Sequence, residues 1–141
     1  LHQVFGLLFV RGERVYHATE LIGHNPDGPT VVMDSDKTKG TSPMVLLLHA
    51  EAGCTGLDVI SLLDKMRQPL KGLKIEVEGI KGDGEFPRIW EKIHVRYIIT
   101  GPIDPEKAHK AVELSLTKYC SVSAMLGKAA EVTHEVVLIA E

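Results

Sequence analysis

Alternating apolar and polar positions in the first third of the chain predict strands joined by turns. VFGLLFV at 4–10 and RVYHATELI at 14–22 flank Gly12 and Glu13, which we expect to form a hairpin connection. PTVVMD at 29–34 predicts a third short strand after a stretch rich in turn formers. The chain therefore opens with a small antiparallel arrangement of strands.

A long helix is predicted from Ser42 and Pro43 to Met66. Serine can cap a helix, and proline is tolerated in the first turn, where its missing N–H group would have no partner. We expect Pro69 to end the helix. Its first half is apolar on nearly all sides, which indicates a centrally buried helix. In its second half we expect four apolar side chains to face inward: Leu57, Val59, Ile60 and Leu63.

The remainder alternates between strands and helices. Two strands with period-two alternation precede a second helix that begins at Asp104 and Pro105, and a further helical stretch and a last strand follow. The expected ranges are 73–80 and 88–100 for the two strands, 121–130 for the helical stretch and 132–140 for the last strand. The order predicts one α+β domain over residues 1–141 with a mostly antiparallel sheet. One small sheet cannot cover such apolar helices, so we also expect a partner subunit.

The composition of the chain argues against some classes of function. The 141 residues carry 19 acidic and 16 basic side chains, a net charge of −3, so no bulk attraction to nucleic acid or an anionic membrane is expected. Charged side chains interrupt the most apolar window, so we expect no membrane span. Two cysteines, no glycosylation sequon and no export signal favour a reducing cytoplasm.

The two cysteines are the first candidates for chemistry. Free cysteine is often simply buried, so two structural thiols are one interpretation of Cys54 and Cys120. Polar neighbours favour reactivity instead: Thr55 follows Cys54, and Ser121 and Ser123 follow Cys120. A thiol near free backbone N–H groups at a helix start or break can become a thiolate nucleophile.

Other candidate sites are weaker. Glu51 lies three residues before Cys54 and shares its helical face, where a carboxylate disfavours ionisation of the thiol unless it accepts a proton or an arginine lies between them. The alternative interpretation is that Glu51 is a solvated acid on the surface of the helix. His49 points to a different face and is expected to be packed or partly exposed. The histidines show no metal-binding spacing and no C-x-x-C motif is present, so no zinc site is expected. The glycine-rich run 79–85 is expected to be a hairpin rather than a phosphate loop.

Two segments carry a family resemblance. SPMVLLLHAEAGCTGLDVISLLDKMRQ and LSLTKYCSVSAMLGKAAEVTHEV resemble the OsmC/Ohr superfamily of osmotically inducible and organic hydroperoxide resistance proteins. The similarity is greatest to the OsmC-like branch with a K-Y-C-S-V second-cysteine motif, and it extends over most of the chain.

The resemblance implies both an assembly and a chemistry. It implies an intertwined homodimer in which antiparallel sheets wrap two central helices, with active sites at the subunit interface. It also implies a thiol-dependent peroxidase that reduces organic hydroperoxides in oxidative-stress defence, with Cys54 as peroxidatic and Cys120 as resolving cysteine. An external dithiol would restore both thiols, without metal, haem or flavin.

The sequence departs from the family pattern at one place. Family members usually carry an acid just after the first helix begins, where it holds an arginine against the thiolate; here Met44 and Val45 stand at those positions. Glu51 is the nearest acid, and Arg11 and Arg14 are the candidate arginines. The departure motivates an alternative: a non-catalytic protein of the same fold that binds a lipid-like small ligand.

Overall fold

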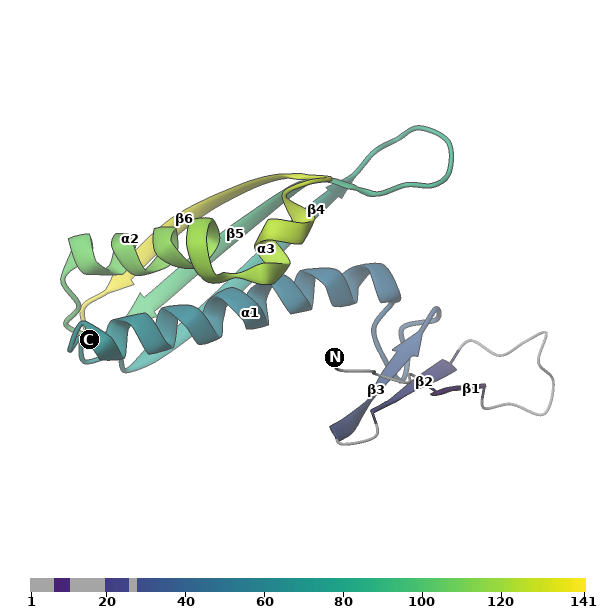
Figure 1. Ribbon diagram of the computed structural model, residues 1–141, viewed down its shortest axis with the longest axis horizontal. Coiled ribbons are helices and arrows are strands. Elements are labelled where there is room, and N and C mark those ends of the chain that lie inside the picture. The colour runs from purple at the N-terminus through teal and green to yellow at the C-terminus, as the bar shows by residue number, and fades with distance from the viewer. Residues whose placement is uncertain (1–6, 11–19, 26–27) are drawn as a thin grey trace. The chain divides into compact units, whose positions relative to one another are not determined.

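A computed structural model describes residues 7–10, 20–25 and 28–141 (Figure 1). The chain divides into two compact units, residues 1–47 and 48–141. The long helix α1 begins in the first unit and continues in the second. The expectation of a single domain over residues 1–141 stays a prediction.

The first unit contains a three-stranded antiparallel sheet in the order β1-β2-β3. Its strands are Leu7–Val10, Glu20–Asn25 and Gly28–Asp34. The Asp34 carboxylate closes the loop after β3 by accepting backbone hydrogen bonds from Asp36, Thr38 and Lys39. All three predicted strands are confirmed where the structure describes them. The predicted connection at Gly12 and Glu13 lies outside the described residues.

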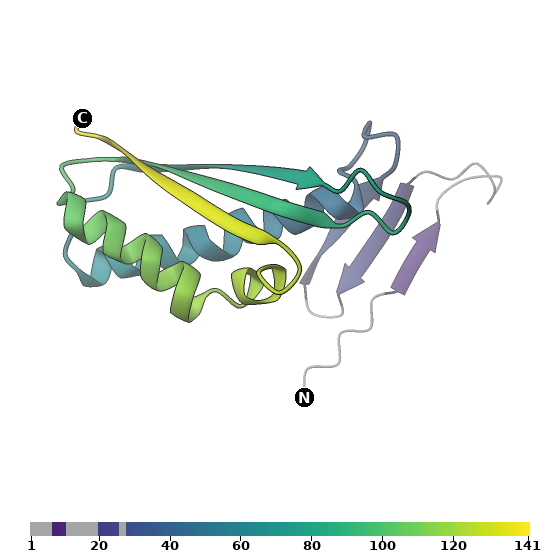
Figure 2. The same cartoon turned by 90° about the horizontal axis from the view of Figure 1, so that it is seen from above.

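The second unit is a three-stranded sheet with helices on one face (Figure 2). Strand β5 is central: it pairs antiparallel with β4 and parallel with β6. The parallel pair departs from a mostly antiparallel sheet, because the chain between β5 and β6 crosses over through helices instead of a tight turn. The strands are β4 Gly72–Lys81, β5 Trp90–Thr100 and β6 Glu131–Ile139.

The crossover contains three short helical pieces. They are α2 Pro105–Leu114, the π-helical turn η2 Ser115–Tyr119 and α3 Ser121–Leu126. Asp104 caps α2 as predicted, since its carboxylate accepts the Glu106 N–H at 2.9 Å. The last helix is shorter than the predicted 121–130. A turn after Leu126 ends it, and the chain must enter β6 at Glu131, opposite Lys92 of β5.

Helix α1 spans Pro43–Lys65, starting where predicted. It ends through a Schellman motif rather than at Pro69. Arg67 adopts a positive φ of 56°, its N–H donates to the Asp64 carbonyl at 2.8 Å, and the Gln68 N–H donates to the Leu63 carbonyl at 2.9 Å. These bonds satisfy carbonyl groups that would otherwise lack partners at the end of the helix.

The core lies between α1, α2 and the inner face of β5. Alternate residues of β5 are fully buried, while its other face carries an exposed ion-pair network in which Arg96 contacts Glu76 and Glu135. On α1, only one side is buried, so the prediction that Leu57 and Ile60 point inward is wrong: they are 72% and 46% exposed. The sheet reaches only the face of α1 that carries Val59 and Leu63.

The length and composition of α1 would allow it to cross a membrane, because an 18-residue window has a mean hydropathy of 1.4. Within the chain, one side of this helix packs against the rest of the second unit. Val59 and Leu63 pack in the core, and two acidic side chains, Glu51 and Asp58, bond to serines of the crossover.

Candidate functional site

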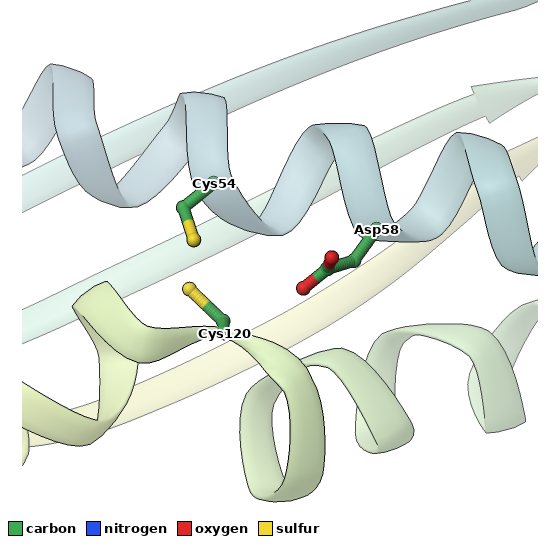
Figure 3. A group of neighbouring side chains, drawn as sticks. All are labelled: Cys54, Asp58 and Cys120. Atoms are coloured by element: carbon green, nitrogen blue, oxygen red, sulfur yellow. The ribbon is translucent and has the colours of Figure 1, made fainter. Parts of the chain in front are cut away.

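The fold brings the two cysteines together although 65 residues separate them in the chain. Cys54 lies on α1 and Cys120 at the start of α3, and Figure 3 shows their sulfur atoms pointing toward one another. The two Sγ atoms lie within 4.8 Å. Cys120 is buried, with 3% of its surface exposed, whereas Cys54 is only partly buried. One thiol is therefore accessible and the other shielded.

The π-helical turn η2 determines where Cys120 lies. Its wide turn closes with a bond from the Cys120 N–H to the Ser115 carbonyl at 2.8 Å, after which the backbone of Cys120 becomes extended. Cys120 then caps α3: its Sγ atom accepts the Ser123 N–H at 3.3 Å. This confirms the prediction of a thiol at a helix start, beside a backbone N–H group.

The surroundings of Cys120 favour its protonated form. Burial raises the pKa of the Cys120 thiol, and its hydrogen bond to Cys54 acts in the same direction, against the opposing contribution of Ser123. Cys120 therefore holds its proton more firmly than an ordinary cysteine, which is the opposite of the thiolate character expected for a thiol at a helix start.

Asp58 is the third member of the group. It follows Cys54 by four residues, so both side chains lie on one face of α1. Its carboxylate oxygen lies within 4.8 Å of both sulfur atoms, and Figure 3 shows the carboxylate directed toward the pair. The Ser115 hydroxyl donates to Asp58 Oδ2 at 2.9 Å, which fixes the orientation of the carboxylate.

Glu51 is fully buried, so the interpretation of Glu51 as a solvated surface acid is wrong. Its Oε1 atom accepts a hydrogen bond from the Ser123 hydroxyl at 2.6 Å. Burial raises the pKa of the Glu51 carboxyl, against the opposing effect of this bond. Glu51 is thus linked through Ser123 to Cys120, not directly to Cys54.

Two buried polar atoms lie close to this network. Glu51 Oε2 and the Tyr97 hydroxyl are the buried side-chain atoms without a hydrogen-bond partner in the part of the chain that the structure describes. Burial raises the pKa of Tyr97, and the nearby Glu51, Cys120 and Asp58 add to this, so its hydroxyl stays neutral. A protonated carboxyl group has no charge, so its burial costs less free energy than burial of a carboxylate.

The polar neighbours predicted beside the sulfur atoms are only partly confirmed. Ser123 contacts Cys120 as expected, but the Thr55 hydroxyl donates to the Glu51 backbone carbonyl at 3.1 Å, along its own helix. His49 is exposed, in agreement with its predicted placement. Sequence reasoning missed Asp58; its spacing of four residues from Cys54 was the available signal.

The acid beside the sulfur atoms is Asp58, not a residue at the start of α1. The first turn of α1 contains no acid, as the sequence predicted. Of the three arginines in the second unit, Arg96 bonds to Glu76 and Glu135, Arg88 stacks on Phe86, and Arg67 lies in the turn that ends α1. Arg11 and Arg14, the predicted candidates, lie outside the described residues.

Comparison with known proteins identifies the family. The family model described as OsmC-like protein matches residues 35–135. The chain is 35% identical over 121 residues to protein YhfA of Escherichia coli K12, covering 84% of this chain and 90% of that protein.

Solved structures show the same fold. The OsmC-like protein of Mycoplasma pneumoniae has a TM-score of 0.80 at 13% identity, over 98% of both chains. An organic hydroperoxide resistance protein of Elizabethkingia anophelis has a TM-score of 0.68 at 14% identity, over 97% of this chain and 96% of that one. The fold is therefore the α+β OsmC fold, and the chain belongs to the OsmC-like protein family.

Proposed function

We propose that the protein is a thiol-dependent peroxidase that reduces organic hydroperoxides in defence against oxidative stress. The observation that carries the proposal is the pairing of an accessible thiol with a buried one: Cys54 Sγ and Cys120 Sγ lie within 4.8 Å on opposed elements. The name of the Elizabethkingia structural neighbour, an organic hydroperoxide resistance protein, supports the same class of substrate.

The difference in exposure supports different roles for the two sulfur atoms. Cys54, the more accessible thiol, attacks the terminal oxygen of the hydroperoxide as a thiolate; the O–O bond breaks, and the alkoxide leaves as alcohol after taking a proton. Cys54 is then a sulfenic acid. The Cys120 sulfur attacks it, and the sulfenic hydroxyl leaves as water with the proton of that thiol.

The two-electron reduction of the hydroperoxide thus equals the two-electron oxidation of the thiol pair. A disulfide has an S–S length of about 2.05 Å, so the sulfur atoms must approach further before the bond forms. An external dithiol returns both thiols by exchange. The cycle needs no metal, haem or flavin.

Glu51 acts in this scheme as a positioning residue. Its carboxyl group holds the Ser123 side chain, and the backbone N–H of the same serine donates to Cys120 Sγ. This contact orients the resolving sulfur toward Cys54. The role differs from an action on Cys54, which the sequence allowed only if Glu51 accepts a proton or an arginine lies between the two side chains.

The proposal also covers the oligomeric state of the protein and its cellular compartment. We infer a homodimer, because the apolar side chains Leu57 and Ile60 stay exposed on α1 within one chain. They line an open groove together with Leu70 and Pro69. Reduced thiols and an external dithiol fit a reducing cytoplasm, with no role for nucleic acid or membrane.

Peroxide consumption by cysteine variants tests the function. The reduced wild-type protein should consume cumene or tert-butyl hydroperoxide with a dithiol present, and Cys54→Ser should abolish turnover because the nucleophile is lost. Cys120→Ser is the matched control: it should form one sulfenic acid per chain, trapped by dimedone and detected by mass spectrometry, without sustained dithiol-dependent turnover.

Two results would contradict the proposal. Equal turnover by Cys54→Ser and wild type would exclude Cys54 as the peroxidatic residue. Inert thiols together with a co-purified apolar ligand in native mass spectrometry would favour the alternative, a non-catalytic protein that binds a lipid-like molecule.

A further inference from the structure

The group formed by Cys54, Asp58 and Cys120 has the composition of a metal site. Its three donor atoms, two sulfurs and one carboxylate oxygen, all lie within 4.8 Å of one another. We propose that the reduced protein binds one zinc ion per chain through the sulfur atoms of Cys54 and Cys120 and a carboxylate oxygen of Asp58. The proposal does not depend on the peroxidase activity, because it uses the same side chains for coordination instead of electron transfer.

The donor types and their spacing fit zinc. Thiolate sulfur selects zinc over magnesium and calcium, and a carboxylate completes many zinc sites. In a tetrahedral site with Zn–S near 2.3 Å and Zn–O near 2.1 Å, donors lie roughly 3.5–3.8 Å apart. Donors that already lie within 4.8 Å reach this geometry through side-chain shifts of about 1 Å.

Two of the three ligands are already oriented by a second layer of hydrogen bonds. The Ser115 hydroxyl donates to Asp58 Oδ2 at 2.9 Å, which fixes the orientation of the carboxylate. The Ser123 N–H donates to Cys120 Sγ at 3.3 Å. Such outer contacts keep ligands in place and are typical of built zinc sites. The π-helical turn positions both groups: Ser115, which bonds to Asp58, is its first residue, and Cys120 follows its last residue.

The site would retain an open position and a route of entry. Three protein ligands leave the fourth tetrahedral position to water or an exogenous ligand. Cys54 and Asp58 are only partly buried, so the ion can approach from their side. Binding displaces the protons of both thiols, and the resulting two thiolates and one carboxylate more than neutralise the ion. A zinc ion held there occupies both sulfur atoms and so blocks their oxidation.

Metal titration of the full chain tests this site. Reduced, metal-free wild type should bind one Co²⁺ per chain, with thiolate-to-cobalt charge-transfer absorption that zinc then abolishes by displacement. Cys54→Ser and Cys120→Ser should each lose most of this absorption. Asp58→Asn, which keeps the shape of the side chain, should weaken zinc binding by about tenfold or more. Asp64→Asn, an exposed acid on the same helix, is the matched control and should bind as wild type does.

Circular dichroism of Cys54→Ser and Cys120→Ser that matches the wild-type spectrum separates loss of ligands from loss of fold. Wild type that shows no charge-transfer absorption, or Asp58→Asn that binds zinc as tightly as Asp64→Asn, would overturn the three-ligand site. Peroxide turnover is measured separately, on the metal-free protein. A metal-free protein without turnover that still binds zinc when titrated refutes only the peroxidase, and an active protein that binds no zinc refutes only the metal site.

Discussion

The sequence and the structure place Glu51 beside different groups. Beside Cys54 in the chain, it looks like a group that acts on that thiol. In the fold its carboxyl group bonds to Ser123, 72 positions away, and is closed off from solvent. Asp58, which drew no attention in the sequence, instead directs its carboxylate toward both sulfur atoms (Figure 3).

The buried carboxyl of Glu51 should make stability depend on pH. The pKa of Glu51 is raised in the folded state above its ordinary value of 4.5. Between these two pKa values the unfolded chain loses the proton while the folded chain keeps it. Wild-type stability therefore falls as pH rises through this window, by up to about 1.4 kcal/mol per pH unit, and levels off above the folded-state pKa.

The variant Glu51→Gln lacks this ionisation and should lose the associated pH dependence. Its stability relative to wild type should thus improve as pH rises from 4.5, as measured by urea unfolding at a series of pH values. Glu113→Gln, on the exposed side of α2, is the control and should follow wild type. Parallel pH profiles for Glu51→Gln and wild type would show that Glu51 ionises normally in the fold.

At the scale of elements, the site depends on how α1 and the crossover meet over one face of the sheet. Strand β5 alternates buried and exposed residues as its pattern predicted, and the buried side chains support α1 and α2. The π-helical turn, by contrast, has no signature that simple periodicity would reveal. It reorients the chain at Ser115–Tyr119 and so places Cys120.

Gly101 connects β5 to the segment that leads into α2 and should be intolerant of a side chain. Its φ is +138°, and an added Cβ would lie 2.6 Å from the Pro69 carbonyl oxygen. Gly101→Ala should therefore lower the free energy of unfolding by roughly 1–3 kcal/mol, measured by chemical denaturation. In Gly84→Ala, where no atom lies within 4 Å of the new Cβ, the change should stay small. Equal stabilities of the two variants would contradict the steric argument.

At the scale of the whole molecule, exposed apolar side chains on α1 motivate the proposed homodimer. Leu57 is 72% exposed, and burial of a leucine stabilises an interface by about 1.5–3 kcal/mol. Leu57→Asp should therefore weaken self-association at least about tenfold, more if a two-fold axis repeats the contact. Sedimentation velocity over a range of concentrations measures this change.

Phe86→Asp is the control for this experiment, because Phe86 is 82% exposed but lies in the connection between β4 and β5. It should leave the dimer intact. A monomeric wild type, or a Leu57→Asp variant that dimerises as strongly as wild type, would refute an interface through this side of α1.

The sequence by itself determined the element order, the family and the two cysteines, because periodicity, caps and motifs are local properties of the chain. The start of α1 at Pro43 and the cap at Asp104 follow from backbone groups only a few residues away. Only the tertiary structure decided the parallel pairing of β6, the exposure of Leu57 and the gathering of Asp58 with two sulfur atoms. These features depend on which segments pack together across many residues, and no local pattern encodes that choice.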